Sequence, residues 1–519
     1  MSQSSATKAQ PEFTGWRAIF WPIHNFELKK FLPMGFMMFC ILFNYTVLRD
    51  TKDSLVVTAP GSDAGVLAFI KLWGTLPSTF IFMVVYAKLA NVLSKENLFY
   101  ASILPFLIFF TVFSLVIYPN IDFFHMSLDT LTSYHDQYPH AKRFFTMIGN
   151  WSFSVFYIMS ELWGSVVISV LFWQFANEIT RVQEAKRFYA LFGMLGNVGL
   201  IFSGTAVWYF SEITRGMPKF EAQALSIKYL MSAVALLGFT CVSIYWWMNR
   251  NVLTDKRLYN PDESAGAKKG KSKKPKLSLA ESFKHILSSP YLGLIAMLVL
   301  SYGVSINVVE GVWKGQIKIR FPNLNDYNAF MGRFSMTTGV ITIILMLVGS
   351  NILRRFSWRT AAMITPVMIM ITSLMFFGAI LYSNQYSPFD AFMGTTIVMM
   401  TILVGMAQNV LSKSTKYSLF DSTKEMAYIP LDQELKVKGK AAVDMIGGRA
   451  GKSGGALIQV IVLTVFAGQN LADLAGVLAF VVIGIVALWL VSVFALGKRF
   501  KQLTGDPTPG ETDSKSKAA

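Results

Sequence analysis

The stretch Lys438-Gly-Lys-Ala-Ala-Val-Asp-Met-Ile-Gly-Gly-Arg-Ala-Gly-Lys-Ser-Gly-Gly-Ala-Leu-Ile-Gln459 runs into an apolar segment, so its second half is expected at membrane depth. Arg449 and Lys452 are three residues apart and therefore share one helical face. The surrounding glycines allow a helix or a ligand to approach the backbone closely. An unpaired cation in a bilayer costs at least about 2.5 kcal/mol, so it normally faces a bundle interior or water. We therefore predict a site for an anion, with an ion pair to a neighbouring helix as the alternative.

The composition of the whole chain supports a polytopic membrane protein. Of its 519 residues, 53% are hydrophobic and only 15% are charged. The formal net charge of +17 would suggest nucleic acid for a soluble protein, but in a membrane protein it has to be interpreted by location. We therefore expect the protein to lie in a lipid bilayer and to bind no nucleic acid.

Apolar segments of spanning length predict the fold class. We expect twelve transmembrane helices in an all-α protein, because each segment is close to the twenty residues that a bilayer requires. The predicted spans are 31–48, 66–87, 98–118, 147–175, 188–210, 226–248, 286–309, 329–351, 360–382, 391–412, 442–466 and 474–496.

The long basic segment between the sixth and seventh spans divides the chain. We expect two six-helix halves, 31–248 and 286–496, resembling the major facilitator architecture, joined by a linker at 249–285. Residues 1–30 form a tail with a short interfacial helix near Phe13 to Trp21, and residues 497–519 form the other tail. Most lysines and arginines between spans fall on the side with both termini, which predicts that the tails and the linker are cytoplasmic.

Few ionisable residues interrupt the spans, and each is a functional candidate. Glu161 lies well inside the fourth span and has no charge at helical spacing, so its partner must come from another helix. Glu310 and Lys314 end the seventh span one turn apart, where a local ion pair is as good an interpretation as a substrate role. Arg333 opens the eighth span and either snorkels to the interface or contacts substrate. Lys52 lies where the first span ends.

Amides such as Asn307 add hydrogen-bonding capacity to these charges, and a basic, amide-rich set suits a phosphorylated substrate. Residue types alone indicate an organic-anion transporter. Gly447 to Ser453 resembles a phosphate-binding P-loop, but it has three residues where four are needed and no strand before it. We therefore expect no enzyme activity. The histidines between Pro119 and Lys142 match no metal-ligand spacing, so neither a metal nor a cofactor is expected.

Several stretches resemble the nucleotide transporter family of obligate intracellular bacteria and plastids, the ATP:ADP antiporters of Rickettsia, Chlamydia-like organisms and plants. The matching stretches run from the first span to the eleventh. They are Phe26–Met34, Leu48–Ala59, Ser160–Ser165, Phe172–Asn177, Glu184–Tyr189, Asn307–Lys314, Asp421–Asp432, Lys436–Ala442 and Gly451–Ala456.

The resemblance implies a bacterial inner-membrane carrier that exchanges ATP for ADP and thereby imports host ATP. It also implies four charged residues needed for transport, which fall on Lys52, Glu161, Glu310 and Lys452. Proton-driven import of nucleoside triphosphates occurs on a similar scaffold and remains the alternative. Phosphate is a candidate co-substrate, and we expect a monomer.

We expect the polyphosphate to bind Lys452, Arg449 and Lys52, with Lys314 and Arg333 as weaker candidates. Glu161 and Glu310 would hold the cations apart when no substrate is bound.

Overall fold

The computed structural model describes residues 21–255, 258–259, 289–385, 397–431, 440, 443 and 448–504. All regular elements in these ranges are helices, because a backbone that crosses lipid must satisfy its hydrogen bonds within the segment. Eleven of these helices are long and apolar enough to cross a membrane, and the shorter apolar helix Ala450–Val465 is the twelfth candidate. The predicted all-α polytopic fold class is confirmed.

The first half of the chain forms six spans, three of them composed of several consecutive helical segments. Short π-helical stretches continue the α-helices inside the second, third and fourth spans. The elements are α2 (Leu28–Thr58), α3 (Val66–Phe69), η2 (Ile70–Thr75), α4 (Leu76–Val92), α5 (Lys95–Val112), η3 (Phe113–Ile117), α6 (Ile121–Phe124), α7 (Leu128–Gln137), α8 (Lys142–Gly149), α9 (Trp151–Trp163), η6 (Gly164–Phe172), α10 (Trp173–Ile179), α11 (Val182–Glu212) and α12 (Lys219–Asn251).

The second half repeats this plan without the helical loop α6–α8. Its tenth span also contains a π-helical stretch. The elements are α15 (Pro290–Arg320), α16 (Leu324–Arg355), α17 (Trp358–Gln385), α18 (Ile397–Thr415), η9 (Lys416–Phe420), α19 (Asp421–Ala427), α21 (Gly448–Val465) and α22 (Ala475–Thr504).

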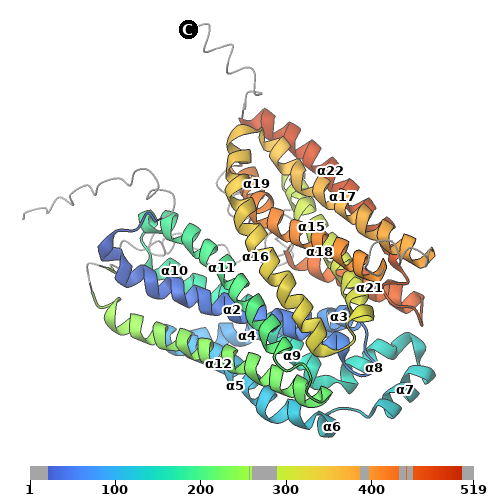
Figure 1. Ribbon diagram of the computed structural model, residues 1–519. Coiled ribbons are helices and arrows are strands. Elements are labelled where there is room, and N and C mark those ends of the chain that lie inside the picture. Colours follow the sequence, from blue (N-terminus) through green and yellow to red (C-terminus); the bar gives the residue numbers. More distant parts are fainter. Residues whose placement is uncertain are drawn as a thin grey trace, which may run out of the picture.

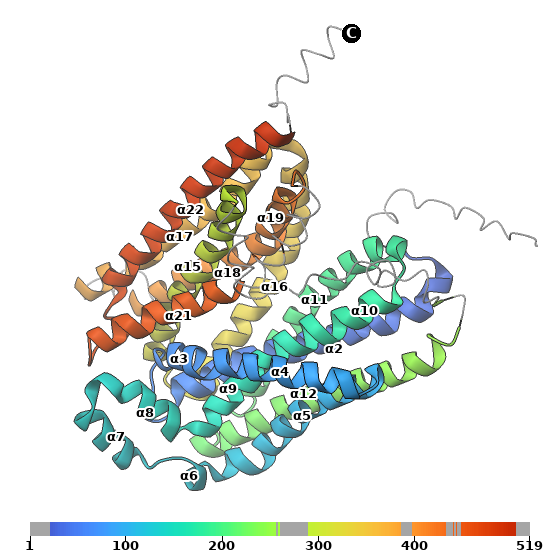
Figure 2. The same ribbon diagram turned by 180° about the vertical axis from the view of Figure 1, so that it is seen from behind.

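The two halves form a V (Figures 1 and 2). They diverge toward the start of α2 and the end of α22, which we term the open end. They converge where α2 and α11 end and where α16 begins, around α3 and α8, which we term the closed end. The helices that face the other half are α2, α3 with η2, and α11 on one side, and α15, α16 and α21 on the other.

The most extensive contact between the halves is made by α11 and α16. Glycines allow it, since a Cβ on Gly204 would lie only 2.5 Å from the carbonyl oxygen of Gly332. A Cβ on Gly332 would lie 2.6 Å from the backbone nitrogen of Trp208. The two backbones therefore cross in direct contact, which small residues permit in membrane helices.

Most spans end a few residues later than predicted, and three of them continue by ten residues or more. The helix α2 extends to Thr58, α15 extends to Arg320, and the tenth span continues through η9 and α19 to Ala427. Hydropathy ended each of these spans at charged residues, which the structure instead places inside the helices.

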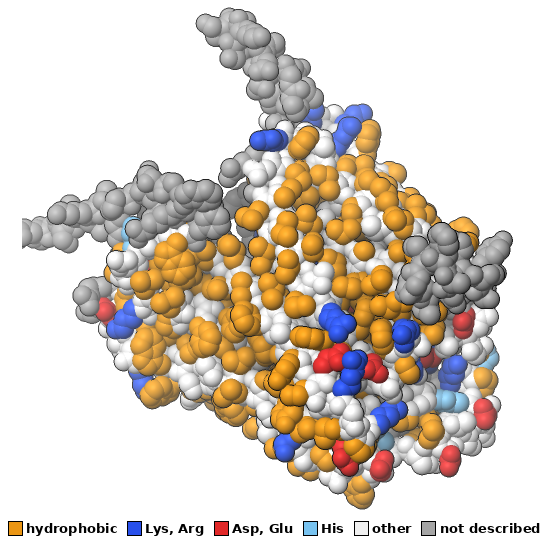
Figure 3. Space-filling model, viewed as in Figure 1, with side chains coloured by type: hydrophobic (Ala, Val, Ile, Leu, Met, Phe, Trp, Pro, Cys, Tyr) orange, Lys and Arg blue, Asp and Glu red, His pale blue; other side chains and the backbone are white. Residues whose placement is uncertain are grey.

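Hydrophobic side chains cover most of the outer face between the ends of the halves (Figure 3). Charged side chains gather near the ends, most densely at the closed end. This distribution matches an apolar belt in contact with lipid. The expected interfacial helix near Phe13, most of the basic linker and the last fifteen residues lie outside the described residues.

Candidate functional site

Lys52 lies in the last two turns of α2, where it is buried and enclosed by groups of its own half. Its Nζ atom is 2.8 Å from Oδ1 of Asp53 and 3.0 Å from Oε1 of Glu161 on α9. The same Nζ atom lies 3.8 Å from the ring centre of Tyr157, one turn before Glu161. Glu161 thus has the partner from another helix that its isolated position predicts.

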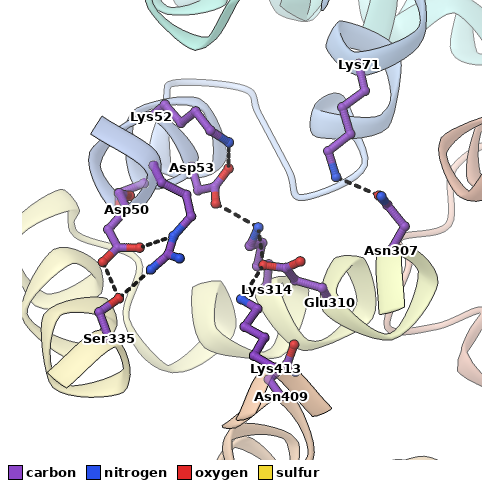
Figure 4. Close-up of polar contacts among 12 residues, drawn as sticks. Asp50, Lys52, Asp53, Lys71, Asn307, Glu310, Lys314, Ser335, Asn409 and Lys413 are labelled. Atoms are coloured by element: carbon purple, nitrogen blue, oxygen red, sulfur yellow. Dashed lines mark hydrogen bonds and ion pairs between the residues drawn. The ribbon is translucent and has the colours of Figure 1, made fainter. Parts of the chain in front are cut away.

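Lys314 on α15 connects this group to the second half. Its Nζ atom is 2.7 Å from Oδ2 of Asp53 and 3.1 Å from Oε1 of Glu310. Lys413 on α18 lies 3.4 Å from the same Glu310 oxygen. The local Glu310–Lys314 pair is therefore present, but it belongs to a continuous chain of charges from Lys52 to Lys413 (Figure 4).

A second polar contact between the halves lies one turn earlier on α2. Arg49 binds Oδ1 of Asp50 at 3.0 Å and donates to Oγ of Ser335 on α16 at 2.7 Å. The Ser335 hydroxyl donates in turn to Oδ2 of Asp50 at 2.5 Å. Asp50 and Ser335 are fully buried, so α2 and α16 are joined by a satisfied polar network.

Glycines position Lys452 near the start of α21. A Cβ on Gly451 would lie 3.0 Å from the Cα atom of Gly303, near the middle of α15. A Cβ on Gly455 would lie 2.7 Å from Cβ of Asn307. The close helix approach predicted from these glycines is therefore used by α15, and it places Lys452 at mid-depth in the second half.

Lys452 differs from the other lysines because its side chain is exposed. No hydrogen bond or ion pair joins it to another residue within the described part of the chain. It interacts electrostatically with Glu161 and Lys52 of the first half and with Glu310 of its own half. Lys452 therefore lies on the inner side of the V, facing the first half.

Asn307 is a further contact between the halves. Its Oδ1 atom accepts a hydrogen bond of 2.7 Å from Nζ of Lys71 on η2. Its carbonyl oxygen accepts a bond of 3.0 Å from Nε2 of Gln459 on α21. Through its side-chain amide and its backbone carbonyl, Asn307 thus joins three spans beside the charged chain.

Arg333 is separate from this group. Its side chain is 56% exposed and lies 3.4 Å from Oε1 of Glu212 on α11, with the guanidinium 5.7 Å from the centre of the Trp208 ring. It contacts none of the other predicted site residues. Arg449 is the second residue of α21, and its side chain is outside the described part of the structure.

π-Helical turns occur next to several of these residues. Lys71 lies in η2, η6 begins three residues after Glu161, and η9 begins three residues after Lys413. Such turns break the regular i→i−4 hydrogen bonding and are frequent at functional sites. They identify the second, fourth and tenth spans as places where the helix geometry departs from regularity to position charge.

The motif-based selection missed several members of the network. Asp53 and Asp50 lie in the same Arg-Asp-Thr-Lys-Asp stretch as Lys52, and the presence of two carboxylates beside two cations was the available signal. Lys413 follows Asn409 by one turn, so both lie on one face of α18 (Figure 4). No local pattern identifies Ser335.

The site carries more cations than carboxylates. The members around the inner side of the V are Arg49, Lys52, Lys71, Lys314, Lys413 and Lys452 against Asp50, Asp53, Glu161 and Glu310. Lysine and arginine side chains form short, charge-assisted hydrogen bonds to phosphate oxygens. The arrangement can therefore hold a multiply charged anion between the two halves.

Known proteins resemble this chain over nearly its whole length. Residues 6–500 match the model of the family described as TLC ATP/ADP transporter. The chain is 49% identical over 501 residues to "ADP,ATP carrier protein 1" of Chlamydia pneumoniae, covering 95% of each chain. It is 44% identical over 503 residues to the protein of the same name from Rickettsia bellii, covering 97% of this chain and 99% of that one.

The relationship extends to plastids and, at the level of the fold, to other transporters. "ADP,ATP carrier protein 1, chloroplastic" of Arabidopsis thaliana is 45% identical over 507 residues, or 97% of this chain and 78% of that protein. A bacterial homologue of the iron transporter ferroportin in an inward-facing state has a TM-score of 0.59 at 12% identity, covering 92% of this chain and all of that chain. A D-xylose-proton symporter gives 0.55 at 11%, covering 90% and 97%. These structures share the fold, and on the sequence matches the chain belongs to the TLC ATP/ADP transporter family.

Proposed function

We propose that this protein exchanges ATP for ADP across a bacterial inner membrane by alternating access, importing host ATP in return for ADP. Family membership and the names of relatives at 44–50% identity support this substrate pair. The gradients of the two nucleotides suffice to drive the exchange, so no hydrolysis step is required.

The observation that supports the mechanism best is the charged chain that joins the two halves near the closed end. Lys52 comes from one half, Lys314 and Lys413 come from the other, and Lys452 faces them from the inner side of the V. A polyphosphate placed among these lysines would contact both halves at once. Rocking of the halves about such a site is the basis of alternating access.

We assign the polyphosphate to Lys452, Lys52 and Lys314, with Arg449 as a further candidate beside Lys452. Glu161 and Glu310 hold Lys52 and Lys314 in position. Arg333 is assigned to the contact with α11 instead of the site, since Glu212 is its ionic partner. Aromatic and amide side chains on the inner side would receive the adenine base.

Transport by the full-length protein in liposomes tests this function. Liposomes loaded with ADP should take up labelled ATP rapidly, and the label should be recovered as intact ATP. Liposomes without internal nucleotide should take up little, with or without a proton gradient. Accumulation of ATP by nucleotide-free liposomes when the outside is acidified would replace exchange by proton-coupled import. Adding phosphate inside with ADP tests whether phosphate is a co-substrate.

We further propose that both termini and the linker face the cytoplasm and that the carrier acts as a monomer. The excess of lysine and arginine on that side supports the orientation. A cysteine placed in the linker between Asn249 and Lys284 should resist a membrane-impermeant thiol reagent added to intact cells. Rapid labelling from outside would reverse the orientation. Both native cysteines are buried and should not interfere.

A further inference from the structure

Asp53 is the residue that joins the two halves within the charged site. Each of its carboxylate oxygens is 2.7–2.8 Å from a lysine Nζ, that of Lys52 on its own helix and that of Lys314 on α15. The residue is only 2% exposed. Both lysines also have a carboxylate in their own half, Glu161 for Lys52 and Glu310 for Lys314. Asp53 is thus the carboxylate that a lysine of each half shares.

Other ion pairs between the halves are exposed to solvent. Arg333–Glu212 and Arg215–Asp326 involve arginines that are 56% and 68% exposed, and exposed pairs contribute little. Within the described part of the chain, Asp53–Lys314 is the ion pair between the halves in which both side chains are buried. A buried pair is costly to break, because each charge left behind remains in a medium of low dielectric constant.

Rocking the closed end apart would separate α2 from α15 and would therefore break the Asp53–Lys314 contact. Asp53 would keep Lys52, and Lys314 would keep only Glu310. A phosphate oxygen bound to Lys314 would replace the lost carboxylate, so that the lysine retains two anionic partners throughout. The two oxygens of Asp53 occupy the same lysine hydrogen-bonding positions that phosphate oxygens would take.

We propose that Asp53 is the positioning residue that makes movement of the halves depend on bound nucleotide. Asp53 binds Lys314 in the conformation in which the closed end is joined. Lys314 leaves Asp53 when a phosphate of the nucleotide replaces the carboxylate. This inference rests on the proposed exchange function. We call the Asp53–Lys314 contact a latch, because bound nucleotide is needed to break it. Without nucleotide, reorientation would deprive Lys314 of a buried partner and is therefore slow.

The test is release of labelled ATP from liposomes containing the full-length protein, measured with and without ADP outside. The wild type should release ATP rapidly only when ADP is present. Asp53→Asn keeps the size of the side chain and removes its charge, and it should raise release without ADP about tenfold, lowering the ratio of the two rates. Lys314→Gln breaks the same contact from the other side and should also raise release without ADP, although its exchange rate falls because Lys314 is assigned to the polyphosphate.

Two variants distinguish a latch from a general structural role. Glu212→Gln removes an exposed carboxylate that also joins the halves, and it should leave the ratio unchanged. Asp53→Glu retains the charge and should restore the dependence on ADP at least partly. A purely structural Asp53 would lower both rates in proportion in Asp53→Asn and leave the ratio unchanged, and this outcome would overturn the inference.

The outcomes are separable from those that test the function. If ADP outside does not stimulate ATP release by the wild type, the exchange function itself fails. If the wild type exchanges but neither Asp53→Asn nor Lys314→Gln shows increased release without ADP, only the latch is wrong. Should Asp53→Asn not fold, as judged by gel filtration and thermal unfolding, the release rate of Lys314→Gln without ADP decides the question: a rate above that of the wild type supports the inference, and an unchanged or lower rate overturns it.

Discussion

Lys52 and Lys452 are two cations of one site in opposite surroundings. Lys52 is buried and contacts two carboxylates and an aromatic ring near the closed end. Lys452 is exposed on the inner side of the V and forms no hydrogen bond or ion pair within the described residues. The difference teaches that the charges near the closed end form ion pairs with one another, whereas the inner side of the V presents a charge that is available to a ligand. The first lysine should therefore matter to stability and transport, and the second mainly to binding.

The largest expected effect is that of Lys52→Gln. Removing this cation leaves Asp53 and Glu161 short of a buried partner, which should lower the free energy of unfolding by about 3–5 kcal/mol. Exchange in liposomes should be lost as well. Thermal unfolding in detergent and ATP uptake measure the two effects. Lys88→Gln, at an exposed position on α4, is the matched control and should change neither.

A stability of Lys52→Gln equal to that of the wild type would show that the closed end does not depend on this network.

Lys452→Gln should separate binding from stability. An exposed lysine without a protein partner contributes little to folding, so thermal unfolding should match the wild type. If bound nucleotide desolvates Lys452 against a phosphate, ATP binding to the purified protein should weaken by roughly 2–5 kcal/mol in the variant, because a buried charge of the ligand loses its partner. Calorimetric or fluorescence titration measures the affinity. Unchanged affinity in correctly folded protein would remove Lys452 from the site.

Gly332→Ala tests the backbone crossing at the closed end. The added Cβ would lie 2.6 Å from backbone atoms of α11, which cannot move aside as a side chain could. Forcing the helices apart should cost about 1–3 kcal/mol of stability. It should also weaken the neighbouring contacts between the halves. Gly378→Ala, where a Cβ meets nothing within 4 Å, is the control. Equal thermal stability of both variants would mean that the crossing is not tightly packed.

The smallest effect concerns His125, in the loop that follows the third span. Burial against Phe153 lowers the pKa of His125 to about 4, with Asp122 acting in the opposite direction. The unfolded chain therefore binds a proton below pH 6.5 that the folded chain does not bind until about pH 4. Stability should fall as the pH falls through this range, by about 1 kcal/mol between pH 7 and pH 5 after allowance for partial exposure.

Thermal unfolding of wild type and His125→Gln at both pH values measures this effect. The variant should lose less stability than the wild type on acidification. Identical pH dependence would show that His125 contributes nothing to it.

The sequence predicted the helices well because apolar length is a local property. It also selected Lys52, Glu161, Glu310 and Lys452 as candidates, since a charge within an apolar span is conspicuous on its own, and their role in transport stays a prediction. It ended the first and seventh spans too early, because hydropathy counts each charge as unfavourable whether or not another helix neutralises it.

The pairings themselves were beyond sequence reasoning. Asp53 and Lys314 are separated by 261 positions, and no periodicity connects them. The expectation that carboxylates hold the cations apart agrees with Glu161 and Glu310 only in part, since Asp53 also draws Lys52 and Lys314 together. Arg333 had the same local appearance as the site residues, and only its partner Glu212 on another helix distinguishes it.

The crossing of α11 and α16 divides each helix into a long arm toward the open end and a short arm toward the closed end. Gly204 lies 22 residues after the start of α11 and eight before its end. Gly332 lies eight residues after the start of α16, which is at the closed end, and 23 before its end. At 1.5 Å per residue, the arms measure about 33 Å toward the open end and about 12 Å toward the closed end. If the halves pivot at this crossing, a rotation of about 10° moves the open end by about 6 Å but the closed end by only about 2 Å. A displacement of this size is small beside the molecule, yet it is enough to separate a carboxylate from a lysine.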